Sequence, residues 1–264
     1  MAIQPEVLVP QKEAVVDYSW SKSESGSSMS RNLTNLERMF VIFNKDLYGQ
    51  NCPFIGATIT MKHQDESSKP LSLNISQLKE RAEQAFAQTR WCYPTVAARV
   101  VDETKAVYDI LSEAEVRQWA GRTVRMVSQE GGWSSVREQV SRDAPIPSPD
   151  GDYCLFYIIT RPDEAEKIIT TFDVLMHTHH VFTDGSGIRS VLNEFLWRLA
   201  SPLDEKEVVW GREAGRLFLP SCMLVKEEEA DAEDGSKSGT RLKGFGVSFA
   251  ILCVFIPVAN WSIA

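Results

Sequence analysis

The chain has 264 residues, 43% hydrophobic and 24% charged, so it can bury a large core as one large domain or two small ones. The formal net charge of -8 argues against a general nucleic-acid binder, because such a protein needs a basic surface to neutralise phosphates. The five cysteines are widely spaced and include no C-x-x-C pair, which argues against a disulfide framework or a zinc ribbon and favours a reducing, cytoplasmic compartment.

The first half of the chain predicts an arm followed by mixed helices and strands. Residues 1–32 are polar and rich in serine, which predicts an irregular arm with at most one short strand, and their start shows no signal peptide. Periodicity and capping signals then predict five elements. In chain order these are a helix at 33–49, a strand at 54–63, a helix at 74–94, a hairpin at 95–111 around "DETK" and a short helix at 112–124 that opens with a Ser112–Glu115 capping box.

The next segment predicts two buried strands and an amphipathic helix. Residues 131–152 are expected to be mostly loop, and the apolar runs 153–159 and 167–180 are expected to be strands. After Gly187, apolar residues recur with the 3.6-residue period of a helix until Pro202.

The C-terminal segment differs in composition from the rest. Residues 225–243 predict an acidic linker, and residues 244–264 are apolar and uncharged. We favour a translated intron for this tail, because Gly-Val-Ser at 246–248 can be encoded across a GTGAGT-type splice donor. The alternative is a membrane anchor, since the tail is long enough to cross a bilayer, but only Arg241 and Lys243 supply basic flanking charge.

Three of the four histidines lie in "LMHTHHVFTDGSG", where the second predicted buried strand turns into the last helix. In one interpretation His177, His179 and Asp184 bind zinc, although Val181 occupies the position where metallo-hydrolases usually continue with aspartate. In a second, His180 is a general base in a loop that glycine keeps open. In a third, the histidines are satisfied core residues, but clustering buried polar groups is costly without a use.

The stretch "HHVFTDG" resembles the H-H-x-x-x-D-G signature of the acyltransferases that share the chloramphenicol acetyltransferase fold. "YDILSEAEVRQWA" and "VVWGREAGRLFLPS" are similar to the fungal branch of trichothecene 15-O-acetyltransferase-like proteins. The resemblance covers roughly residues 33–224. It implies an α/β fold, an α+β two-layer sandwich, present as the single N-terminal half-domain of a two-domain architecture. The second-half D-F-G-W-G motif of the plant branch is absent.

The resemblance also implies roles for the motif residues. His180 would be the general base that deprotonates the acceptor, with His179 in a supporting role. Asp184 would be structural and pair with an arginine, and Gly185 would leave room for substrate. No metal and no covalent acyl-enzyme are implied.

The function implied is acyl-CoA-dependent O-acylation, with acetyl-CoA the expected co-substrate and a hydroxyl of a fungal secondary metabolite the expected acceptor. The partners would be that small alcohol and acyl-CoA, with no nucleic acid, and the protein would be a monomer. Without a second half the polypeptide is expected to lack one wall of the acyl-donor tunnel. Two alternatives are a non-catalytic acyltransferase-like binding protein and a zinc-dependent hydrolase.

Overall fold

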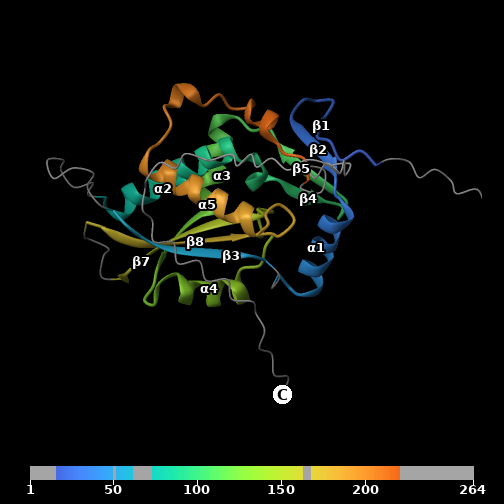
Figure 1. Ribbon diagram of the computed structural model, residues 1–264. Coiled ribbons are helices and arrows are strands. Elements are labelled where there is room, and N and C mark those ends of the chain that lie inside the picture. Colours follow the sequence, from blue (N-terminus) through green and yellow to red (C-terminus); the bar gives the residue numbers. More distant parts are fainter. Residues whose placement is uncertain (1–15, 50–51, 62–72, 163–167, 221–264) are drawn as a thin grey trace, which may run out of the picture.

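The computed structural model describes residues 16–49, 52–61, 73–162 and 168–220, which form two four-stranded sheets and five α-helices (Figure 1). The predicted linker and apolar tail lie outside these described residues. No helix within the described ranges is long and apolar enough to cross a membrane. The expected mixed α/β class is confirmed.

The larger sheet forms the centre of the molecule. Its strands, in spatial order, are β3 (Phe54–Thr60), β8 (Thr171–Thr178), β7 (Cys154–Thr160) and β6 (Val124–Ser128). The β6–β7 pair is parallel, and the other two pairs are antiparallel. Every residue of β7 is buried, which explains why its sequence is an unbroken apolar run rather than an alternating one.

Helices cover both faces of this sheet, as Figure 1 shows. One face carries α2 (Ile75–Cys92), α3 (Glu113–Thr123) and α5 (Gly185–Ala200), and the other carries α4 (Gly132–Asp143). Side chains of β7 alternate between the two cores: Phe156 and Ile158 pack with α2 and α5, and Leu155 and Tyr157 pack on the α4 side. The apolar period-3.6 stripes predicted for α2 and α5 are therefore the faces that seal the larger core.

The helix α4 contradicts the expectation that residues 131–152 are mostly loop. Gly131 precedes the helix in the left-handed conformation, with φ of 87°. Val136 and Val140 are buried against the sheet, and Trp133 packs at the edge of the same cluster. The flanking glycines and prolines obscured this narrow apolar stripe, which is surrounded by serine, arginine and glutamine.

The smaller sheet is antiparallel throughout and has the order β1-β2-β5-β4. It contains β1 (Ser21–Lys22), β2 (Ser28–Asn32), β5 (Lys105–Asp109) and β4 (Arg99–Val101). The hairpin expected around "DETK" is confirmed as β4 and β5. The serine-rich segment before residue 33 supplies two strands rather than at most one, because β2 pairs along its whole length with β5.

Candidate active site

The three histidines lie at the end of β8 and in the turn that follows it. The strand ends at Thr178, so only His177 is part of it, whereas His179 and His180 lie beyond it. The expectation that the strand continues to residue 180 is wrong. The chain leaves the sheet because the Phe182 amide donates to the His179 carbonyl at 3.3 Å, which closes a tight turn.

Hydrogen bonds brace this turn against the neighbouring strand segment. The His179 amide donates to the Tyr153 carbonyl at 2.9 Å, and the Thr178 hydroxyl donates to the same carbonyl at 3.2 Å. The Thr178 and Thr183 hydroxyl groups are 2.9 Å apart across the turn. The start of the turn is therefore held at the Tyr153 carbonyl, and its end is held to its start through the two threonine hydroxyls. These bonds restrict the positions of His179 and His180.

His179 is a structural part of the turn. Its side chain is buried, and its Nδ1 accepts the Val181 amide at 3.0 Å, which places the proton of the neutral ring on Nε2. The ring packs against Tyr153 with centroids 5.2 Å apart. Burial, followed by the charge of His180, lowers the pKa of His179 to about 4. A buried, neutral ring that already accepts a backbone amide is suited to holding the turn.

His180 has a different environment. Its ring is partly exposed and stacks face to face on Phe40 of α1 (Asn35–Asp46), with centroids 4.1 Å apart and an interplanar angle of 4°. Nδ1 is buried and has no hydrogen-bond partner, whereas Nε2 is not among the buried unpartnered atoms of the described residues. The ring is thus held from one side, and Nε2 is the nitrogen left for an incoming group.

Asp184 is the N-cap of α5. Its Oδ1 accepts the Gly187 amide at 2.6 Å, the Ser186 amide at 3.0 Å and the Ser186 hydroxyl at 2.9 Å. Bonds from Gly187 and then from the Ser186 side chain lower the pKa of the Asp184 carboxyl. Gly185 is the first residue of the helix. The arginine partner and the open space implied for these two positions stay predictions.

Replacing Asp184 with alanine is expected to lower the free energy of unfolding by about 1 kcal/mol, because two helix amides lose their acceptor. Asp184→Asn should retain most of that energy, since asparagine caps as well as aspartate. Chemical denaturation of the two variants measures the difference. Equal losses in both would contradict the capping role and point instead to the carboxylate charge.

His177 lies apart from the other two histidines, on the α4 side of the sheet. Its ring is fully buried and stacks on Phe54 with centroids 4.0 Å apart, and neither ring nitrogen has a hydrogen-bond partner. Burial lowers its pKa to about 3. Across the described residues, no group of three or more histidine, cysteine, aspartate or glutamate side chains could hold a metal ion. The structure therefore does not support the alternative of zinc bound by His177, His179 and Asp184.

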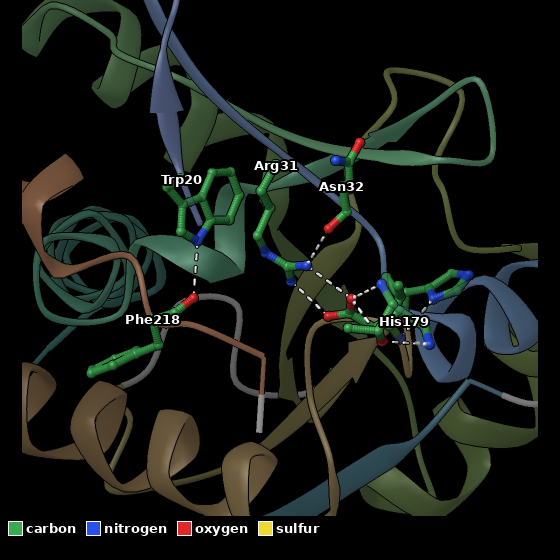
Figure 2. Close-up of polar contacts among 8 residues, drawn as sticks. Trp20, Arg31, Asn32, His179 and Phe218 are labelled. Carbon is green, nitrogen blue, oxygen red and sulfur yellow. Dashed lines mark hydrogen bonds and ion pairs between the residues drawn. The ribbon is translucent and has the colours of Figure 1, made fainter. Parts of the chain in front are cut away.

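The N-terminal segment builds one wall beside the turn. The α1 helix is the one expected at 33–49, and a capping box between Thr34 and Glu37 starts it. The buried Arg31 of β2 donates to both carboxylate oxygens of Glu37, at 2.6 and 2.8 Å. Figure 2 shows Arg31 close to the turn that carries His179. Leu33 and Val181 share a small buried cluster, so the arm and the turn pack as one unit.

Sequence reasoning did not identify Phe40, Tyr153 or Arg31 as residues around the motif. A signal for Phe40 exists, because residues 33–49 hold more apolar side chains than one buried helix face requires. That excess indicates that the helix makes a second contact but does not identify the segment that it contacts. Nothing in the local sequence points to the other two.

The structure places a buried strand, a histidine-bearing turn and a capped helix in succession on a mixed sheet, which is the arrangement expected of an acyltransferase of this type. The sequence profile of the family described as 15-O-acetyltransferase Tri3 matches residues 8–240. This match covers well over half of the chain, so the chain belongs to the Tri3 acetyltransferase family. The family and branch expected from the motif are confirmed.

Two curated relatives agree with this assignment. The chain is 27% identical to trichothecene O-acetyltransferase TRI3 of Trichoderma arundinaceum, over 92% of this chain and 50% of that protein. It is 25% identical to the acetyltransferase pigO of Monascus ruber, over 59% of this chain and 30% of that protein. The chain thus spans half or less of the length of these relatives.

A solved structure shares the fold. The TRI3 trichothecene 15-O-acetyltransferase from Fusarium sporotrichioides superposes with a TM-score of 0.63 at 20% identity, covering 78% of this chain and 43% of that one. The match confirms the expected acyltransferase fold, in which this chain corresponds to less than half of the solved protein.

Proposed function

We propose that this chain is the base-bearing half of an acetyl-CoA-dependent O-acetyltransferase that acts on a hydroxyl group of a fungal secondary metabolite. Membership of the Tri3 acetyltransferase family is the observation that carries the proposal. The two relatives, a trichothecene O-acetyltransferase and an acetyltransferase, support the reaction class.

In the proposed reaction, His180 Nε2 removes the acceptor hydroxyl proton as the oxygen attacks the thioester carbonyl of acetyl-CoA. A new C–O bond forms, the C–S bond breaks, and the proton passes from His180 to the departing sulfur, which leaves as free coenzyme A thiol. The acceptor leaves as its acetate ester. Nδ1 is buried without a hydrogen-bond partner, whereas Nε2 is not one of the buried unpartnered atoms of the described residues and belongs to a partly exposed side chain, which supports this assignment of the two nitrogens.

The remaining motif residues act through His180. His179 holds the turn through its bond with the Val181 amide, and Asp184 anchors the other end of the turn at the start of α5. Neither group needs to contact the substrate. In this proposal His180 transfers the proton, and His179 and Asp184 keep His180 in place.

The part of the relatives that this chain does not match is proposed to complete the substrate channel. The helix α1, whose Phe40 contacts His180, also exposes large apolar side chains to solvent. Leu36, Met39, Ile42 and Phe43 of the helix, and Leu47 directly after it, are each between 38% and 51% exposed. Burying such a patch is favourable, so this face suits further protein packed beside the site.

The test is release of free thiol from acetyl-CoA in the presence of hydroxylated terpenoid and polyketide acceptors. Two forms are compared: this chain, and this chain extended through the reading frame downstream of Gly244. Acceptor-dependent thiol release in either form supports the proposal. Absence of release in both forms, with the fold intact, would contradict it and favour a non-catalytic acyltransferase-like binding protein.

A further inference from the structure

We infer that Phe40 is a positioning residue for His180, a role that rests on the proposed function of His180 as the base. The two residues are 140 positions apart in the sequence, and no part of the histidine motif indicates their contact. Their rings are parallel to within 4° at a centroid distance of 4.1 Å. Such a face-to-face contact restricts both the tilt of the imidazole and the direction in which its nitrogens point.

The contact is important because the His180 imidazole lacks the hydrogen bond that usually orients a catalytic histidine. Catalytic histidines are commonly oriented by a hydrogen bond to the nitrogen that does not transfer the proton. In this protein Nδ1 of His180 is buried and has no such partner. Ring stacking therefore takes over the orienting role that a carboxylate or carbonyl group usually fills. Asp184 does not fill it, because His180 Nδ1 has no partner and the Asp184 carboxylate instead accepts, through Oδ1, from Ser186 and Gly187.

The helix that carries Phe40 is held at both ends, so the ring is a fixed support rather than a mobile one. At the N-terminal end, Arg31 binds the Glu37 carboxylate and Thr34 caps the first turn. At the C-terminal end, the buried Asn44 side chain donates to the Ile146 carbonyl at 2.7 Å. Phe40 lies between these two anchors.

Phe43 provides a matched control on the same helix. It lies one turn further along, is 43% exposed and makes no ring contact with a histidine among the described residues. Phe40→Leu removes the aromatic face but keeps an apolar side chain, and Phe40→Tyr keeps the face. Phe40→Met is a second non-aromatic variant of similar volume in case the leucine variant does not fold.

The first readout is the proton NMR spectrum of the histidine rings, which the chain makes simple because it has only four histidines. Protons over the face of an aromatic ring are shifted upfield. Phe40→Leu or Phe40→Met should move the His180 ring resonances downfield, and Phe40→Tyr and Phe43→Leu should leave them in place. Unchanged His180 resonances in a folded Phe40→Leu protein would overturn the inference.

The second readout is kinetic, in the form of the protein that releases thiol. Phe40→Leu should lower kcat about tenfold and change KM by less than about twofold, because a misdirected base slows proton transfer without removing a substrate contact. Phe40→Tyr should keep kcat near that of the unaltered protein. Equal kcat values for Phe40→Leu and the unaltered protein would overturn the inference. If the unaltered protein releases no thiol, the proposed function fails, whereas the NMR comparison still decides the stacking.

Discussion

Replacing His180 with alanine is expected to lower acceptor-dependent turnover roughly 100- to 10,000-fold, the range that a positioned general base contributes. The physical reason is that an alcohol is a weak nucleophile at neutral pH unless its proton is removed as it attacks. Neither of the other two histidines that the structure describes can take over, because His179 is buried with its Nδ1 engaged by an amide, and His177 lies in the core on the α4 side. Free thiol release measures the loss.

Two companion variants separate loss of the base from loss of structure. His180→Gln keeps a side chain of similar size without a basic nitrogen, so it should lose as much turnover as His180→Ala. His179→Gln removes the acceptor for the Val181 amide and should lower stability more than His180→Gln does. Near wild-type turnover in either His180 variant would show that another group takes the acceptor proton.

Acidification from pH 7 to pH 5 is expected to destabilise the fold by about 4 kcal/mol, about 2 kcal/mol from each of His177 and His179. Burial lowers the pKa of His177 to about 3 and of His179 to about 4, from an ordinary value of 6.5. At a pH between the ordinary pKa of 6.5 and the lowered pKa of each ring, the unfolded chain binds a proton on that ring and the folded chain does not. The stability from the two neutral rings is therefore complete above pH 6.5 and is lost as the pH falls toward 4 and then 3.

Denaturant unfolding at pH 7 and pH 5 measures this loss, and His177→Leu is its control. Both ring nitrogens of His177 lack partners, so leucine should cost little at pH 7. The variant should lose only about half as much stability as the parent protein at pH 5, because one titrating ring remains. Equal acid losses in the variant and the parent would contradict the assignment to His177.

The helical periodicity and capping residues predicted most of the individual elements. The expected capping box is of the kind that local sequence determines, and Ser112 accepts the Glu115 amide at the start of α3. The uniformly apolar strand β7 was also evident, because a strand buried on both faces has no polar positions. The helix α4 was not predicted, since its short apolar stripe lies between glycine and proline segments whose local signals indicate loop.

The sequence shows the order of residues in the motif, but it did not predict that the three histidines lie in different environments. Strand alternation placed His177 and His179 on one face, whereas the chain turns after Thr178 and removes His179 from the strand. That turn depends on bonds to Tyr153, which lies on another segment. The local sequence pattern around the histidines cannot predict a hydrogen bond to a carbonyl group of a distant segment.

By itself, the sequence determined the family, most of the elements and the residue types available for chemistry, because these depend on motif, periodicity and capping over short stretches. Only the tertiary structure decided which histidine has a free nitrogen and what orients it. Phe40 reaches His180 because β2 pairs with β5 and because Arg31 of that strand holds Glu37 at the start of α1. Such long-range contacts follow from packing of the whole chain, in which each pairing is stable only when the others are present.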